Sequence, residues 1–212
     1  MENERECFEE IAYKGYTVLI EIDEYPLNPR EESDCLGTIY YGRSRNCIYG
    51  DKEVDGIDGL ANELGLYKSN GDDFEEEEEE AICKALSKDY IWIDVNFCSL
   101  NICAVSKDTI RKEYGWKNIT KKRIAQIEKY LQSEVDEFTA YCEGEVYCYN
   151  IHSRDNEEID GCCGIYGDSG LEYLKEDAKS IIDYHIKYEL KAKYNQLKSY
   201  IRGNVPLIYR FV

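Results

Sequence analysis

Apolar side chains recur at every second position from Tyr16 to Ile22, the periodicity of a β-strand with one face buried. A second strand is predicted over residues 35–42 (CLGTIYYG), after a turn-rich segment that holds two prolines. The two runs predict an antiparallel pair joined by an extended loop.

Apolar positions three or four apart predict helices in the rest of the chain. The longest such stripe begins after a capping threonine, Thr120, and ends at Gly144, a typical C-terminal stop. A shorter helix is predicted between Ser106 and Gly115. The remaining predictions are a short helix at residues 57–64, a helix from about Asp73 to Lys88, one or two buried strands over 90–106, a β-hairpin over 145–168, a long helix over 171–202 and an edge strand after Pro206.

This order of elements predicts an α+β fold, with a mainly antiparallel sheet and three or four helices, one of them long and C-terminal. We expect an acidic N-terminal lobe, residues 1–105, and a helix–hairpin–helix C-terminal lobe, residues 106–212, packed as one unit.

The most unusual local feature is the tract from Asp72 to Glu80, in which eight of nine residues are acidic. It could be a disordered tract, the solvated start of a helix, or a surface that imitates nucleic-acid backbone. Ala81, Ile82, Ala85 and Leu86 follow it at helical spacing, and acidic side chains suit the first turn of a helix. The pattern therefore favours a docked helix over a tail.

Charge is unevenly distributed along the chain, whose formal net charge is −18. Residues 1–105 hold 26 acids against 9 bases, whereas residues 171–212 hold 5 acids against 8 bases. An acidic surface repels phosphate, so we expect no direct binding of nucleic acid by the N-terminal half. A partner with a basic surface is the natural complement, and solubility is the simpler alternative.

The ten cysteines bear on the cellular compartment. The start of the chain, MENERECFEE, lacks the basic and apolar regions of a signal peptide, and no apolar run is long enough to span a membrane. We therefore expect a cytoplasmic protein with no membrane association and with reduced thiols that pack as small hydrophobes.

No motif for a phosphate-binding loop, a zinc protease or a serine hydrolase occurs. We predict no enzymatic activity, no cofactor and no metal. His185 falls on the apolar stripe of the last helix, where a structural role is expected. A zinc site built from His152, Cys148 and either Cys162 or Cys163 is the one metal alternative, because a hairpin could bring them together.

Several segments resemble a widespread, uncharacterised family of bacteriophage and mobile-element proteins. The pieces that carry this resemblance cover a little over half the chain. Two tryptophans of the family pattern are absent: Ser33-Asp34-Cys35 stands before LGT, and Cys163 stands in CCGIYG. The acidic helix lies outside the matching pieces, which are YKGYTVLIEIDEYPLNPREESDCLGTIYY, VSKDTIRKEYGWKNITKKRIAQIEKYLQSEVDEF, GEVYCYNIHSRDNEEIDGCCGIYGD and YLKEDAKS.

The resemblance implies a phage setting, in which small acidic proteins without catalytic motifs often inhibit host immunity. We therefore expect an inhibitor of the anti-CRISPR or anti-restriction class that binds a basic nucleic-acid-binding surface of a host protein or ribonucleoprotein defence complex by phosphate mimicry. The residues expected to bind the partner are acidic: Asp72, Asp73, Glu75, Glu76, Glu77, Glu78, Glu79, Glu80, and a second cluster of Asp51, Glu53, Asp55 and Asp58.

Two other functions remain open. One is an accessory phage protein with a ligand-binding, metal-binding or enzymatic pocket around the hairpin, near Tyr147, His152, Cys162, Cys163 and Tyr166. The other is a structural or scaffolding protein whose acids only maintain solubility.

Overall fold

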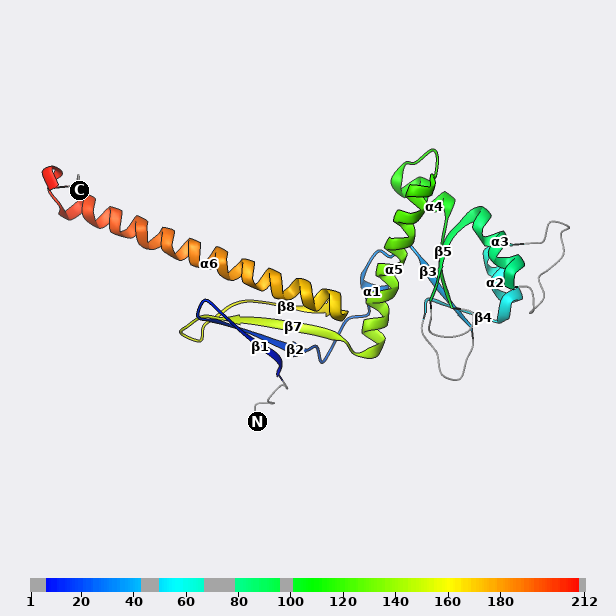
Figure 1. The fold of residues 1–212 in the computed structure, drawn as a ribbon, viewed down its shortest axis with the longest axis horizontal. Coiled ribbons are helices and arrows are strands. Elements are labelled where there is room, and N and C mark those ends of the chain that lie inside the picture. The colour runs from blue at the N-terminus through cyan, green and yellow to red at the C-terminus, as the bar shows by residue number, and fades with distance from the viewer. Residues whose placement is uncertain (1–6, 43–49, 67–78, 96–100, 210–212) are drawn as a thin grey trace. The chain divides into compact units, whose positions relative to one another are not determined.

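The computed structural model describes residues 7–42, 50–66, 79–95 and 101–209, which belong to two compact units (Figure 1). Unit 1 joins residues 1–26 to residues 145–212, and unit 2 comprises residues 27–144. The expected boundary at residues 105/106 instead falls inside a strand of unit 2. The reason is that the first strands of the chain pair with the hairpin after residue 145, so unit 1 is assembled from both chain ends.

Unit 1 contains a four-stranded antiparallel sheet in the order β1-β2-β7-β8. The tight turn between its first two strands places Lys14 and Gly15 at φ 50° and 83°, as a two-residue hairpin of type I′ requires. A register shift between Cys7 and Glu9 interrupts the alternation of β1, which explains why the sequence pattern did not predict that strand. The strands are β1 (Cys7–Tyr13), β2 (Tyr16–Ile22), β7 (Val146–His152) and β8 (Glu158–Tyr166).

One face of this sheet is covered by the first half of α6 (Gly167–Asn204). Leu174, Ala178 and Ile182, spaced four apart, lie buried against Val18 and Ile151. The predicted long C-terminal helix is confirmed. The predicted edge strand after Pro206 is wrong for residues 207–209, which form a short 3₁₀ helix, η1 (Leu207–Tyr209).

Unit 2 has three layers around the four-stranded sheet β4-β3-β6-β5. Adjacent residues of one strand belong to different clusters: Ile102 and Ala104 pack with α2 and α3, and Cys103 and Val105 pack with α4 and α5. Both faces of the sheet are therefore covered. The elements are α1 (Pro29–Glu32), β3 (Thr38–Gly42), β4 (Lys52–Val54), α2 (Gly56–Leu64), α3 (Glu79–Asp89), β5 (Tyr90–Asp94), β6 (Ile102–Ser106), α4 (Lys107–Tyr114) and α5 (Lys121–Glu143).

The predicted α+β class is confirmed, as are the ends of α4 and α5. Ser106 accepts a hydrogen bond from the Thr109 amide, and Thr120 accepts one from the Arg123 amide. Gly144 ends α5 at φ 77°. Among the described strands, β3 and β4 pair in parallel and the other pairings are antiparallel.

The predicted pairing of residues 16–22 with residues 35–42 is wrong. Both edges of β2 are already occupied, by β1 on one side and β7 on the other. The segment between the two strands forms α1, which Asn28 caps by accepting a hydrogen bond from the Arg30 amide. The chain therefore leaves one sheet and enters the other. Within the described ranges, no helix is both long enough and apolar enough to cross a bilayer.

Candidate functional site

The predicted acidic helix is described only in part. Asp72, Asp73 and Glu75 to Glu78 lie outside the described residues, as do the side chains of Glu79 and Glu80, the first residues of α3. Further along α3, Ile82 and Leu86 are buried in the cluster that α2 also joins. The docked end of the predicted helix is therefore confirmed.

The second acidic cluster divides into two kinds of residue. Asp51 is used inside unit 2, where it binds Arg30 and accepts a hydrogen bond from the Ile39 amide at 2.8 Å. Glu53, Asp55 and Asp58 are exposed, beside or within the first turn of α2. Within this cluster, these three residues are exposed, and Asp51 takes part in the Arg30 network.

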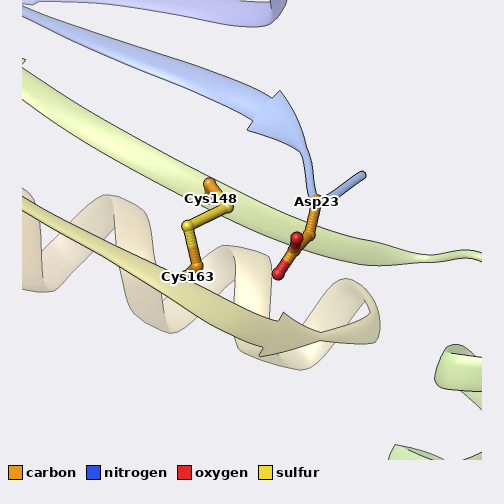
Figure 2. A group of neighbouring side chains, drawn as sticks. All are labelled: Asp23, Cys148 and Cys163. Atoms are coloured by element: carbon orange, nitrogen blue, oxygen red, sulfur yellow. A yellow bond between two sulfur atoms is a disulfide. The ribbon is translucent and has the colours of Figure 1, made fainter. Parts of the chain in front are cut away.

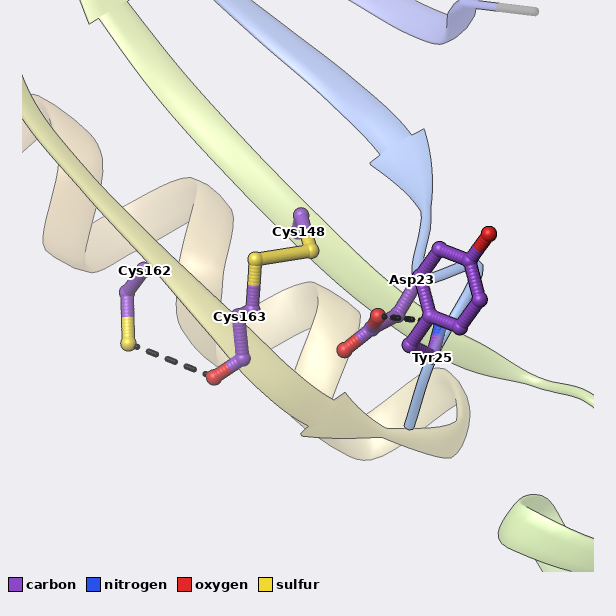
Figure 3. The surroundings of a disulfide bond; sticks show 5 residues. All are labelled: Asp23, Tyr25, Cys148, Cys162 and Cys163. Atoms are coloured by element: carbon purple, nitrogen blue, oxygen red, sulfur yellow. Dashed lines mark hydrogen bonds between the residues drawn. A yellow bond between two sulfur atoms is a disulfide. The ribbon is translucent and has the colours of Figure 1, made fainter. Parts of the chain in front are cut away.

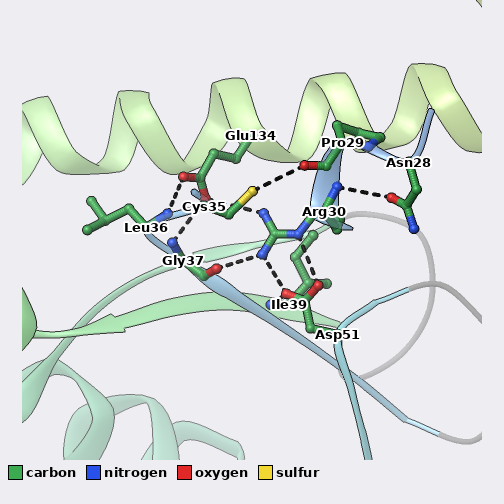
Figure 4. A network of polar contacts seen from close by, with 9 residues as sticks. All are labelled: Asn28, Pro29, Arg30, Cys35, Leu36, Gly37, Ile39, Asp51 and Glu134. Carbon is green, nitrogen blue, oxygen red and sulfur yellow. Dashed lines mark hydrogen bonds and ion pairs between the residues drawn. The ribbon is translucent and has the colours of Figure 1, made fainter. Parts of the chain in front are cut away.

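Asp51 belongs to a network centred on Arg30, whose side chain is only 6% exposed (Figure 4). The guanidinium donates two hydrogen bonds to Asp51, from Nε at 3.0 Å and from Nη2 at 2.5 Å. Nη2 also donates to the Gly37 carbonyl at 2.6 Å, and Nη1 pairs with Glu134 at 3.4 Å. This geometry ties α1, the start of β3 and α5 to one cation.

Glu134 completes the network from α5. Its two carboxylate oxygens accept hydrogen bonds from the amides of Leu36, at 2.5 Å, and Gly37, at 3.0 Å. Burial alone would lower the pKa of Arg30, but hydrogen bonding and attraction from Asp51 outweigh burial and the pKa is raised. Arg30 therefore stays charged, and the network serves to fasten the Leu36–Gly37 backbone to α5.

A cavity of about 1020 Å³ adjoins this network. Arg30, Cys35, Lys52, Tyr114 and Tyr130 are among its lining residues. Burial raises the pKa of the Cys35 thiol, and its Sγ donates to the Pro29 carbonyl at 3.6 Å, so this thiol is held in its protonated, weakly nucleophilic form. The cavity offers polar contacts for a ligand but no activated nucleophile among its described lining residues.

The two helical layers of unit 2 differ in charge. Residues 51–89, which include α2 and α3, hold 14 acids against 4 bases. Residues 107–143, which include α4 and α5, hold 8 bases against 7 acids and are nearly neutral. The central sheet separates these layers, since they pack on its opposite faces. Solubility alone does not require such a division.

The hairpin of unit 1 contains a disulfide between Cys148 and Cys163, on neighbouring strands (Figure 2). The expectation that all cysteines are free thiols is wrong for these two. It rested on the compartment, whereas pairing depends on the register, which sets β7 beside β8. Asp23 lies next to the disulfide, and its ligand atom and the two sulfurs lie within 4.8 Å of one another.

The other hairpin candidates do not converge on this point. Cys162 is exposed, and its thiol donates a hydrogen bond to the Cys163 carbonyl at 3.4 Å (Figure 3). Tyr149, which lies opposite Cys162 on β7, packs toward α6. His152 lies four residues beyond Cys148 on an extended strand, about 13 Å away at the usual rise. The zinc alternative that joins His152 to Cys148 therefore does not fit this geometry. Tyr147 belongs to the α6 cluster and Tyr166 is the last residue of β8.

Sequence reasoning missed the Arg30 network, although one signal was present. Glu134 interrupts the buried stripe of α5 at a position three after Leu131 and four before Phe138. A charged residue on the buried face of a helix requires a partner, which an isolated sequence pattern does not name. No protein-family model, no curated protein and no solved structure matches this chain.

Proposed function

We propose that this protein is a non-enzymatic inhibitor, of the anti-CRISPR or anti-restriction class, that binds a basic nucleic-acid-binding surface of a bacterial defence complex. The acidic α2–α3 layer of unit 2 is the binding surface. The exposed carboxylates of Glu53, Asp55 and Asp58 pair with arginine and lysine side chains that otherwise hold phosphate, and we propose the same role for the acids of the sequence stretch 72–80.

The observation that carries this proposal is the excess of acids in residues 51–89, which include α2 and α3, whereas the α4–α5 layer on the other face of the sheet is nearly neutral. An acidic layer fixed to a sheet keeps its carboxylates at defined positions, as imitation of a regular phosphate backbone requires. Leu60 of α2 and Leu86 of α3 pack in one cluster, which places α2 and α3 in the same layer. The resemblance to phage proteins supports the choice of a host defence target.

The test measures escape of a targeted plasmid in bacteria that carry an active CRISPR or restriction system, with and without this protein. We expect the protein to raise the number of transformants. Glu53→Gln/Asp55→Asn/Asp58→Asn, and separately the replacement of the six glutamates 75–80 by glutamine, should abolish most of that rise. Amides keep the size of each side chain and remove only its charge.

The matched control changes three exposed acids of unit 1, Asp155→Asn/Glu157→Gln/Glu158→Gln. It should inhibit as strongly as the natural chain. Equal loss of activity in the control and the unit 2 variants would refute the assignment to the α2–α3 layer. Absence of protection against a panel of CRISPR and restriction systems would refute the class.

The arrangement of Asp23, Cys148 and Cys163 favours a second candidate function, metal binding by the reduced hairpin. The disulfide offers no thiolate, but its reduction by a thiol reductant would give two thiolates beside one carboxylate, a donor set suited to Zn²⁺. Protein reduced and then dialysed against zinc should retain one equivalent, and Cys148→Ser should retain none. Retention of zinc by Cys148→Ser would place the metal elsewhere.

A further inference from the structure

The second half of α6 presents an apolar stripe that the described residues of unit 1 do not cover. With 38 residues the helix is about 57 Å long, whereas the longest strand beneath it, with nine residues, spans about 30 Å. Figure 1 shows the C-terminal half of α6 continuing past the strands of its sheet. Every residue from 190 to 200 is exposed.

The stripe lies on a different side of α6 from the buried residues Ala178 and Ile182, roughly 90° to 130° around the helix axis at 100° per residue. Its residues are Leu190, Tyr194, Leu197 and Ile201. At 100° per residue these four fall within a sector of about 60°. Leu190, Tyr194 and Leu197 are 63%, 62% and 57% exposed. So narrow a stripe, with steps of four, three and four, has the spacing typical of a helix that pairs with one other helix.

Basic side chains border this stripe on both sides. Lys193 lies on one side, and Lys191 and Lys198 lie on the other, at the positions that flank the seam of a paired helix. Residues 185–204 hold five bases and one acid, in a chain whose net charge is −18. Two copies of this helix would bring like charges together along the seam, which disfavours self-pairing.

A cleft of about 300 Å³ lies where the helix leaves the sheet. Ile186 and Leu190 line it together with Arg154, from the turn between β7 and β8, and Lys193. The cleft is continuous with the stripe through Leu190, so it can receive the end of a helix seated on the stripe.

We infer that residues 186–201 of α6 form a docking surface for an amphipathic helix of another protein, with an apolar seam flanked by glutamate or aspartate. The seam residues of the partner pack on Leu190, Tyr194, Leu197 and Ile201, and its acids pair with the bordering lysines. This surface belongs to unit 1 and is separate from the acidic layer of unit 2.

The experiment uses the full chain and two fluorescent synthetic peptides of four heptads, identical except for glutamate or lysine at the flanking positions. Fluorescence anisotropy should show binding of the glutamate peptide and none of the lysine peptide. Leu190→Gln/Leu197→Gln should weaken that binding at least about tenfold. The control Tyr184→Gln/Tyr188→Gln changes exposed residues on another side of α6 and should leave the affinity unchanged.

Four results would overturn the inference. The first is failure of the glutamate peptide to bind, and the second is equal binding of both peptides. The third is self-association of the chain in sedimentation equilibrium, if Leu190→Gln/Leu197→Gln abolishes it. The fourth is binding of the chain to anionic phosphatidylserine vesicles, if the same variant abolishes it. The third would assign the stripe to a second copy, and the fourth to a lipid surface. Because the stripe is exposed, circular dichroism should show both variants folded.

Discussion

Replacing Glu134 by glutamine should destabilise unit 2 strongly, although the two side chains have nearly the same shape. Glu134 is 9% exposed and accepts hydrogen bonds from two backbone amides while it pairs with Arg30. A glutamine can accept at only one of its two terminal atoms, and its amino group would face a donor. The substitution therefore leaves a buried donor unsatisfied and Arg30 less well compensated.

The magnitude follows from these contacts. A hydrogen bond to a charged acceptor contributes about 1 kcal/mol more than one to a neutral acceptor, and three contacts are affected. Breaking a buried ion pair from one side costs roughly 3–5 kcal/mol when both partners are fully buried. Because Asp51 still compensates Arg30, we expect a loss of about 3 kcal/mol in the free energy of unfolding of unit 2.

The assay is urea unfolding followed by tryptophan fluorescence. The chain has two tryptophans, Trp92 and Trp116, and both belong to unit 2, so the signal reports that unit alone. With a slope of about 2 kcal/mol per molar urea, the midpoint should fall by about 1.5 M. Glu128→Gln, at an exposed position of the same helix, should shift the free energy by less than about 0.5 kcal/mol. Equal midpoints for Glu134→Gln and Glu128→Gln would refute the structural role of the network.

Three further predictions concern stability and thiol chemistry. Burial raises the pKa of the Cys103 thiol from its ordinary value of 9.0 to about 12, so the unfolded chain loses this proton first as pH rises. The contribution of Cys103 to the free energy of unfolding is therefore present below pH 9 and is lost between pH 9 and 12, by up to about 1.4 kcal/mol per pH unit. Cys103→Ala should flatten the alkaline fall of the urea midpoint. An unchanged alkaline slope would contradict this assignment. Gly144→Ala should lower the free energy of unfolding by about 1 kcal/mol, because Gly144 has φ 77° and alanine is strained there. The added methyl group itself meets no atom within 4 Å. Gly59→Ala inside α2 should instead stabilise unit 2, and a neutral Gly144→Ala would argue against the left-handed end of α5. Iodoacetamide under native, non-reducing conditions should modify exposed Cys162 before buried Cys103, and peptide mapping should find Cys148 linked to Cys163; free Cys148 in that map would contradict the disulfide.

Local signals predicted the elements that depend on a few neighbouring residues. The caps at Ser106 and Thr120, the glycine stops and the stripe of α5 each lie within one helix and were correctly assigned from sequence. β1 was missed because its bulge removes the period of two, although the Lys14-Gly15 turn marked the end of a strand.

What the sequence did not predict depends on residues far apart in the chain. β2 pairs with β7, so that Ile20 lies beside Tyr149, and no pattern within residues 16–22 selects that partner over the neighbouring β3. The same limit applies to the disulfide and to Asp51. The sequence suggested that the Asp51 carboxylate lies at the surface, whereas in the structure it pairs with Arg30, 21 residues away in the chain.

The most direct test of the proposed inhibition is competition between this protein and DNA for a purified defence nuclease that it inhibits. The protein should displace fluorescent duplex DNA that is bound to the nuclease, and this displacement should weaken as the NaCl concentration rises. The Glu53→Gln/Asp55→Asn/Asp58→Asn variant should displace the DNA much more weakly than the control variant, Asp155→Asn/Glu157→Gln/Glu158→Gln. Displacement that is insensitive to salt and equal for both variants, or inhibition without any displacement of DNA, would contradict phosphate mimicry by the α2–α3 layer.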